Sequence, residues 1–283
     1  MKKENIDDRV IQVSDGVKLN YISTGSGKPM IMLPGGGLSK DIFKYQIEYF
    51  SSMMNVIALD KRGHGQSEKV DYGYRLARFA KDLYDVIESL NLNEIILMGH
   101  SLGASMIYTY IDLFGLDKIS KLIIIDEPAC LSVNPSWSEV ERQNYGAIYN
   151  LDSLHELTDG FIHDTDDQLK HKIVDMMTTK YISDEQKAFI LSCMKIPNMA
   201  AKQLYFNNIC QDYRDVIRKI NKPCLFITGE KSLHPYQSHQ WLNKQVTNSQ
   251  LYIFSESDDG NHFMFVESPK LFNQVVEAFL TDQ

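Results

Sequence analysis

Residues 94–103 read Glu94-Ile95-Ile96-Leu97-Met98-Gly99-His100-Ser101-Leu102-Gly103. The apolar run before Gly99 is typical of a buried strand, and the residues from Leu102 to about Phe114 have apolar side chains at helical spacing. A serine between two glycines, where a strand meets a helix, is the pattern of a nucleophile elbow. The glycines are needed because a side chain on either one would collide with the adjoining strand or helix. The turn presents the Ser101 hydroxyl at a helix N-terminus that favours developing negative charge, so Ser101 is the candidate nucleophile.

The bulk composition is that of an enzyme-sized globular domain. The chain has 283 residues, 43% of them hydrophobic, with a net charge of −8. A chain of this length buries roughly three-quarters of its unfolded surface and needs no disulfide or metal for stability. The negative charge, without a basic patch, argues against nucleic acid and anionic membranes as partners.

The cysteines and the N-terminus bear on the compartment. Cys130, Cys193, Cys210 and Cys224 form no C-x-x-C pair and no metal-like cluster, so we expect reduced thiols and no metal. Residues 1–8 contain no apolar stretch of the kind a signal peptide has. No segment approaches the roughly 20 apolar residues that a spanning helix requires. We therefore expect a cytoplasmic monomer or small homo-oligomer with no membrane partner.

Strands and helices alternate along most of the chain. Apolar runs predict strands, the first two of them paired as a hairpin, at Val10–Val13, Leu19–Ser23, Pro29–Leu33, Val56–Leu59, Glu94–Met98, Lys121–Ile125, Cys224–Thr228 and Leu251–Phe254. Helical spacing is found between them, at Ile42–Phe50, Leu76–Leu90, Leu102–Phe114, Ser238–Gln245 and Pro269–Leu280. Such alternation predicts the α/β class, with a mostly parallel sheet flanked by helices.

The alternation is interrupted between about residues 129 and 208. This segment has helix-like stretches, no convincing strand and many aromatic and methionine side chains, among them Trp137, Tyr145, Tyr149, Phe161, Met176, Met177, Tyr181, Phe189, Met194 and Met199. Most of these side chains are expected in a small helical core, and a few would line an apolar pocket over the elbow. We therefore predict a core made of residues 1–128 and 209–283, and a helical insertion at 129–208.

Four further segments resemble motifs of the α/β-hydrolase family, in the family's order. They are the strand and glycine loop Met30–Gly37, the D-x-R-G-x-G-x-S loop Asp60–Ser67, the strand ending in Gly-Glu at Pro223–Glu230, and the histidine loop Asp258–Phe263. The resemblance implies an α/β-hydrolase fold in which residues 129–208 are the family's variable lid, and it calls for no cofactor.

Chain order selects the candidate base. A serine needs a base to take its proton, and in this fold the order is serine, acid, histidine. Of the eight histidines, only His262 follows the last strand, in a turn that matches the family. His234 and His239, near another loop at a strand end, are weaker alternatives.

The oxyanion donors are expected from two backbone amides. One is the N–H of Leu102, directly after the nucleophile, and the other comes from the loop Gly35–Gly37. We choose Gly36 because the family's donor commonly follows a His-Gly pair, which Pro34-Gly35 replaces here. The proline leaves the choice between Gly36 and Gly37 open.

The acid departs from the commonest family pattern. The family usually has G-E-x-D after the strand, whereas this chain has Ser232 in the place of the aspartate. A known variation moves the acid to the end of the strand after the elbow, and Asp126 stands there. We therefore predict Asp126 as the acid, with Glu230, Glu127 and Asp258 as alternatives.

These residues together predict a serine hydrolase that cleaves an ester or related carbonyl substrate through an acyl-enzyme. The apolar insertion favours a small, uncharged substrate. A lactonase, a C–C bond hydrolase, or a low-turnover ligand-binding or signalling protein on the same fold are the alternatives, because one fold hosts many chemistries.

Overall fold

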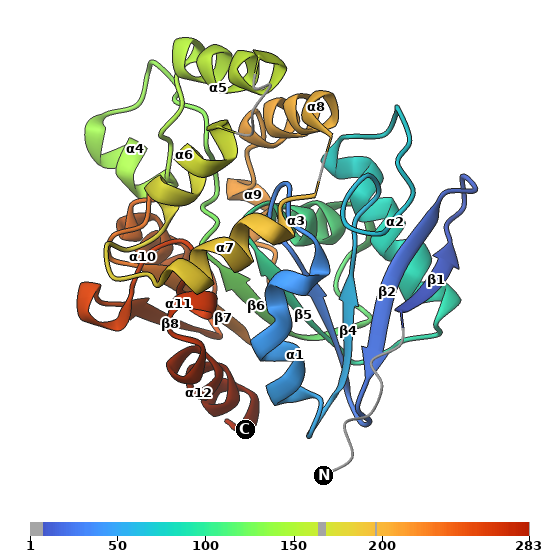
Figure 1. The fold of residues 1–283 in the computed structure, drawn as a ribbon. Coiled ribbons are helices and arrows are strands. Elements are labelled where there is room, and N and C mark those ends of the chain that lie inside the picture. The colour runs from blue at the N-terminus through green and yellow to red at the C-terminus, as the bar shows by residue number, and fades with distance from the viewer. Residues whose placement is uncertain (1–7, 164–167, 196, 283) are drawn as a thin grey trace.

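A mixed sheet forms the centre of the computed structural model, which describes residues 8–163, 168–195 and 197–282 (Figure 1). Its eight strands run in the order β1-β2-β4-β3-β5-β6-β7-β8. The strands are β1 (Asp8–Gln12), β2 (Lys18–Thr24), β3 (Pro29–Leu33), β4 (Asn55–Leu59), β5 (Ile95–His100), β6 (Ile119–Ile125), β7 (Cys224–Gly229) and β8 (Ser249–Phe254). Strand β2 pairs antiparallel with β1 and β4, and the other neighbours pair in parallel. The predicted α/β class with a mostly parallel sheet is confirmed.

The central strands are mostly apolar because both faces of the sheet are buried. Along β3, Ile31 and Leu33 belong to one core cluster, whereas Met30 and Met32 belong to the other. This alternation follows from the two-residue period of a strand, whose side chains point to opposite faces. A continuous apolar run is therefore what a parallel strand between two helical layers requires.

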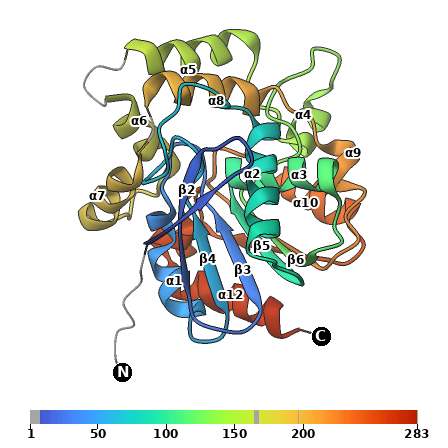
Figure 2. The same ribbon diagram turned by 90° about the vertical axis from the view of Figure 1, so that its right-hand side faces the viewer.

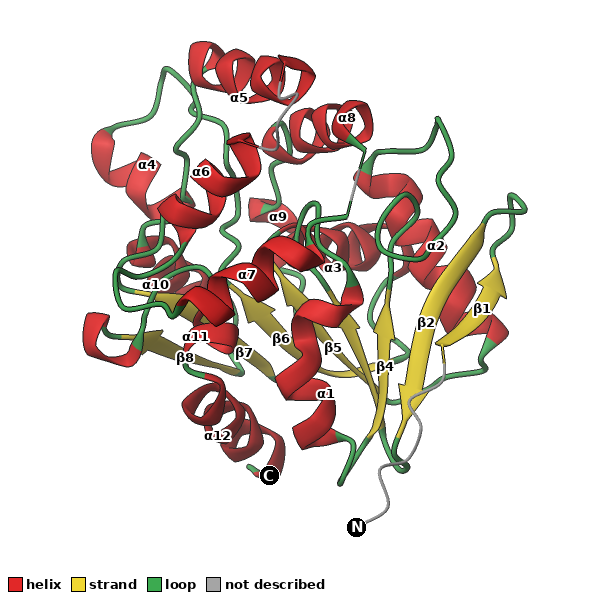
Figure 3. Cartoon of the chain, viewed as in Figure 1, coloured by secondary structure: helices red, strands yellow, loops and turns green. Residues whose placement is uncertain are grey.

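Helices cover both faces (Figures 1 and 3). One layer contains α2 (Leu76–Ser89), α3 (Leu102–Phe114), α9 (Arg214–Ile217) and α10 (Tyr236–Gln245). The other contains the 3-10 turn η1 (Lys40–Phe43), α1 (Lys44–Phe50), α11 (Met264–Glu267) and α12 (Pro269–Thr281), and a second 3-10 turn, η2 (Glu256–Asp258), follows β8. In the first layer, α3 begins at Leu102, directly after β5 ends at His100 and the turn at Ser101. The N-terminus of α3 thus lies at the carboxyl end of β5.

The segment between β6 and β7 is a helical insertion that lies over the carboxyl ends of the parallel strands (Figure 2). It contains α4 (Glu139–Tyr145), α5 (Leu151–His163), α6 (Gln168–Met177), α7 (Asp184–Cys193) and α8 (Asn198–Ile209). Capping boxes start α4 at Ser138 and α7 at Ser183. As expected, no strand occurs in this segment among residues 129–163, 168–195 and 197–208.

The structure describes all four cysteines and the lengths of the helices. All four thiols are free, and Cys130, Cys193 and Cys224 are buried. No helix within the described ranges is both long and apolar enough to cross a membrane.

Candidate functional site

The candidate nucleophile lies on a strained turn between β5 and α3. Ser101 has φ 51° and ψ −128°, a conformation that is uncommon for a residue with a side chain. Its N–H donates a hydrogen bond of 2.8 Å to the carbonyl of Ile125 at the end of β6. A Cβ atom on Gly99 would lie 2.7 Å from Ala104 N, and one on Gly103 would collide with the Leu33 carbonyl. The local geometry is therefore the elbow that the sequence predicts, and both glycines are sterically required.

The candidate base and acid are hydrogen bonded to each other. His262 Nδ1 lies 2.6 Å from Asp126 Oδ2, and both residues are buried. A carboxylate accepts, so Nδ1 carries the hydrogen and the His262 Nε2 lone pair is left to take a proton. His262 and Ser101 line the same cavity. Residues from three separate strand ends are thus brought together.

Asp126 is held at its position by further hydrogen bonds. Its N–H donates to the Ile227 carbonyl at 2.8 Å, and its carboxylate accepts from Thr228 Oγ1 at 2.6 Å and from Ser232 Oγ at 2.5 Å. Burial works to raise the pKa of Asp126, but the hydrogen bond from His262 and the favourable electrostatic interaction with that ring outweigh it and hold the pKa well below its usual range. The carboxylate is therefore ionised, and Ser232 supports it from the position where the family usually has an aspartate.

The alternative acids have hydrogen bonds to groups other than His262. Glu230 accepts from the backbone N–H of Glu256 at 3.1 Å, and Asp258 accepts from Ser255 Oγ at 2.6 Å. Glu127 accepts from Ser105 Oγ and, at 3.3 Å, from Asn208 Nδ2. Of the four carboxyl groups that the sequence left open, Asp126 is the one with a hydrogen bond to His262.

The glycine loop borders the same cavity. Gly35 and Gly36 line it together with Ser101, whereas the N–H of Gly37 donates at 3.3 Å to His64 Nε2. Leu102 is the first residue of α3, and the first four N–H groups of a helix have no acceptor within it. The geometry therefore favours the amides of Gly36 and Leu102 over that of Gly37 as anion donors.

Three other buried histidines surround the acid without replacing His262. His100 Nε2–H donates to the His262 carbonyl at 3.1 Å, and burial lowers the pKa of His100 well below its usual value. Burial also lowers the pKa of His234 to about 3 and that of His239 to about 4, so both rings are neutral. Potential ligand atoms of Asp126, His234 and His262 lie within 4.8 Å of one another, but the first and last are already bonded to each other.

The cavity above Ser101 is small and mostly apolar. Its volume is about 30 Å³, which is room for little more than one water molecule. Its lining combines the residues above with side chains of the insertion, namely Ile173, Met177, Met194 and Tyr205. Met177 and Met194 are among the residues singled out in the sequence, while Ile173 and Tyr205 are not. Met176, Tyr181 and Met199 are exposed instead, and the side chain of Phe161 lies outside the described part of the chain.

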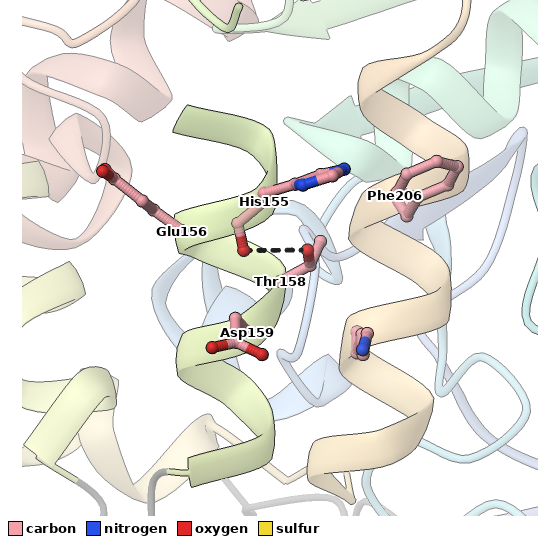
Figure 4. Close-up of a pocket in the computed structure, with 6 residues that line it drawn as sticks. His155, Glu156, Thr158, Asp159 and Phe206 are labelled. Carbon is pink, nitrogen blue, oxygen red and sulfur yellow. Dashed lines mark hydrogen bonds between the residues drawn. The ribbon is translucent and has the colours of Figure 1, made fainter. Parts of the chain in front are cut away.

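A larger groove of about 550 Å³ lies elsewhere, on the insertion between α5 and α8. Figure 4 shows His155, Glu156, Thr158 and Asp159 on one helix and Phe206 on the other. This groove is lined by none of the candidate catalytic residues, so its size does not make it the reaction site.

Several supporting residues were not predicted from the sequence. Thr228 follows Ile227, which pairs with Ile125 in the β6·β7 register, so the adjacency of these strands would have placed Thr228 beside Asp126. Lys61 donates to the carbonyls of Pro34 and Gly35, and His64 accepts from the Gly37 N–H. Both residues lie within the D-x-R-G-x-G-x-S motif, but the motif itself does not indicate these contacts with the glycine loop.

Comparison with known proteins supports the same fold. Residues 28–150 match the family model described as the alpha/beta hydrolase fold. A non-heme haloperoxidase of Rhodococcus erythropolis is 32% identical over 136 residues, 46% of this chain and 50% of that protein. The chain thus spans about half the length of this relative.

Two solved structures match over nearly the whole chain. A bromoperoxidase of Bacillus anthracis and an esterase of Exiguobacterium antarcticum each have a TM-score of 0.88 and 22% identity, covering 98% of this chain and 100% of the other. This likeness is one of fold. Other relatives, between 22% and 26% identical, are named as epoxide hydrolases and an enol-lactonase. The relatives' names therefore do not agree on one substrate.

Proposed function

The chain belongs to the α/β-hydrolase fold family, and on that premise we propose that it is a serine hydrolase that cleaves a small ester through an acyl-enzyme. Ser101 is the nucleophile, His262 the general base and Asp126 the acid. The observation that carries this proposal is the 2.6 Å hydrogen bond between His262 and Asp126, on a ring that shares a cavity with Ser101.

Acylation follows from the roles of these groups. Ser101 Oγ attacks the carbonyl carbon of the ester while His262 Nε2 takes its proton, and the ionised Asp126 stabilises the resulting imidazolium. The carbonyl oxygen becomes an oxyanion that accepts from the N–H groups of Gly36 and Leu102. When the intermediate collapses, the carbon–oxygen bond to the alcohol breaks and His262 returns its proton to the leaving oxygen.

Deacylation repeats the same steps with water. His262 takes a proton from water as it attacks the acyl carbon, and the bond to Ser101 Oγ breaks as the proton returns to the serine. An acyl-enzyme cleaved by hydrogen peroxide instead of water would give a peracid. We propose this perhydrolase reaction as a second candidate because two of the similar proteins are named as peroxidases.

The substrate we propose is a small apolar ester, with lactones, which are cyclic esters, in the same class. A cavity of about 30 Å³ with isoleucine and methionine side chains in its wall disfavours a large or charged acyl group. We also propose that residues 129–208 act as a lid on the core of residues 1–128 and 209–283, because the insertion supplies those side chains.

The test is labelling and turnover of the purified protein. We expect hydrolysis of p-nitrophenyl acetate and butyrate, and reaction of Ser101 with a fluorophosphonate probe. Ser101→Ala should abolish both. Ser105→Ala, one turn further along α3 and bonded to Glu127, is the matched control and should keep both. Peracid formation with added hydrogen peroxide tests the second candidate.

Two outcomes would contradict the proposal. If the wild-type protein neither turns over these esters nor reacts with the probe, it is not a serine hydrolase. If Ser101 reacts but every ester and lactone in a panel of acyl chain lengths is turned over poorly, the chain is a ligand-binding protein that has kept the triad.

A further inference from the structure

Lys61 is a buried cation that the proposed mechanism does not use. It is 2% exposed, and its Nζ donates to the backbone carbonyls of Pro34 at 2.8 Å, Gly35 at 3.0 Å and Leu38 at 3.4 Å. An ammonium has three N–H donors, so these carbonyls satisfy all of them. Each of these acceptors belongs to the loop that carries the proposed oxyanion donor.

The direction of the Gly36 N–H follows from the contacts of the Gly35 carbonyl, which accepts from Lys61 Nζ at 3.0 Å and, at 3.3 Å, from the Leu38 N–H. The carbonyl of Gly35 and the N–H of Gly36 belong to one peptide unit, which is planar and trans, so the two groups point in opposite directions. A carbonyl that is held on Lys61 therefore turns the Gly36 N–H away from Lys61. Gly36 lines the cavity beside Ser101, and the amide is thereby available to that cavity.

The next peptide of the loop is held from the same side. The Gly37 N–H donates at 3.3 Å to His64 Nε2, and the carbonyl of Arg62 lies 2.9 Å from His64 Nδ1. Burial, followed by the nearby charge of Lys61, lowers the pKa of His64 well below its usual value, so the ring is neutral and Nε2 can accept. Residues 61–64 thus form hydrogen bonds with two successive peptide units of the glycine loop.

We propose that Lys61 is a positioning residue for catalysis, which holds the Gly36 peptide so that its N–H meets the oxyanion. This inference rests on the serine hydrolase proposed above. A cation on the Gly35 carbonyl also polarises the peptide, which makes the Gly36 N–H a stronger donor. Lys61 thereby adds positive potential to the oxyanion site without touching the substrate.

The charge of Lys61 depends on pH. Burial lowers the pKa of Lys61 to about 7, against the attraction of Asp60, and the Asp60 carboxylate is shared with Lys40 Nζ at 3.2 Å and with the Gln66 N–H at 2.8 Å. Other titratable groups around this loop are the neutral ring of His64, the His100 ring beside Gly35 and the Tyr205 hydroxyl beside Gly36. The Lys69 ammonium faces His64, to whose carbonyl it donates at 3.1 Å. Deprotonation removes one donor and the charge, so kcat should decline as pH rises through about 7.

The same titration has the opposite effect on stability. The folded-state pKa lies below the ordinary value of 10.5, so between these two pH values the unfolded chain holds more protons than the folded one. Lys61 then makes the folded state more stable as pH rises through this window. A decline of kcat there, without a decline in the melting temperature, separates a positioning effect from unfolding.

The experiment compares Lys61→Met with Lys121→Met in the full chain. Lys121 Nζ also donates to three backbone carbonyls, those of Phe279, Leu280 and Asp282. Lys121 lies near the start of β6, at the end of this strand away from Asp126. With p-nitrophenyl acetate, we expect Lys61→Met to lower kcat at least tenfold and to change KM less than about twofold. The upper limit for the fall in kcat is the roughly 10²–10³-fold cost of losing one oxyanion donor. Lys121→Met should keep the wild-type kcat.

The pH profile completes the test. Wild-type kcat should decline above about pH 7, while in Lys61→Arg, which keeps its charge, the decline should disappear. A wild-type kcat in Lys61→Met, a rise in KM alone, or the same decline in Lys61→Arg would overturn the inference. If Lys61→Met does not fold, the profiles of the wild type and Lys61→Arg decide. A wild-type protein without labelling at Ser101 would instead refute the proposed hydrolase.

Discussion

The core and the insertion border the same cavity, but they hold their residues there by different means. In the core, the N–H of Ser101 bonds to the Ile125 carbonyl and the N–H of Asp126 bonds to the Ile227 carbonyl. Ser101 and Asp126 are thus each held by a backbone hydrogen bond to the end of the neighbouring strand. The insertion contributes side chains, among them Met177 from α6 and Tyr205 from α8. The proposed chemistry therefore depends on backbone geometry, and the substrate preference depends on side-chain packing.

The largest effect should come from the core. Asp126→Asn keeps the size of the side chain but removes the charge that orients and stabilises the imidazolium, so we expect kcat to fall by about 10⁴-fold with little change in melting temperature. Steady-state kinetics with p-nitrophenyl acetate measures this. Asp258→Asn, a carboxylate without contact to His262, is the control. Near-wild-type activity in Asp126→Asn would refute the assignment of the acid.

A change at Glu127, which joins the core to the insertion, should alter the pH dependence of stability. Glu127 accepts from Ser105 in the core and from Asn208 in the insertion, and burial raises its pKa from 4.5 to about 7. The folded state therefore holds a proton that the unfolded chain has lost, and this contribution to stability disappears as pH rises from 4.5 to 7. In the wild type, the free energy of unfolding should thus fall by up to about 3 kcal/mol over this pH range, a factor of roughly 10² in the folding equilibrium. We expect Glu127→Gln to lack this fall.

Thermal or denaturant unfolding at pH 5 and pH 8 measures this change. Glu127→Gln should differ less between the two pH values than the wild type does, while Glu156→Gln, an exposed glutamate on α5, should not. An unchanged pH dependence in Glu127→Gln would mean that this carboxyl group is not what couples the junction to pH.

A smaller effect, on selectivity, should come from the insertion. Met177→Ala enlarges the cavity, so we expect the ratio of kcat/KM for p-nitrophenyl hexanoate to that for the acetate to rise about tenfold, the range that a few methylene groups supply. Met176→Ala is the matched control, because this neighbouring side chain is 53% exposed. Equal ratios in the two variants would mean that α6 does not form the acyl pocket.

The smallest effect should come from a support of the acid. Ser232→Ala removes one of the hydroxyl donors to Asp126 while Thr228 remains, so kcat should fall by about tenfold or less. Ser257→Ala, an exposed serine bonded to Ser255, should have no effect. A fall as large as that of Asp126→Asn would mean that the serine hydroxyl is as important as the carboxylate itself.

The fold and part of the site follow from local sequence patterns. Apolar runs and helical spacing predicted each strand of the core and the helices α1, α2, α3, α10 and α12 to within a few residues, because buried strands and amphipathic helices have distinct apolar periods. The four-residue helices α9 and α11 were not predicted, since one turn is too short to show a period. The elbow at Ser101 is equally local, since the collisions that forbid a side chain on Gly99 or Gly103 arise within the strand–turn–helix unit and its nearest strand. Chain order then separated His262 from the other histidines.

The sequence by itself thus determined the strand–helix order, the nucleophile turn and a short set of candidate acids and amides. Only the tertiary structure shows which of these candidates come together. Asp126 lies 136 residues from His262 in the chain. It reaches the histidine because β7 is the neighbour of β6 and the loop after β8 packs, at Gly260, against Gly229 at the end of β7. The contacts of Gly37 with His64, of Asp126 with Ser232, and of Lys61 with the glycine loop are also long-range. Such contacts depend on which strand ends become neighbours in the sheet. A local pattern of residues does not predict the order of the strands, so it does not predict these contacts.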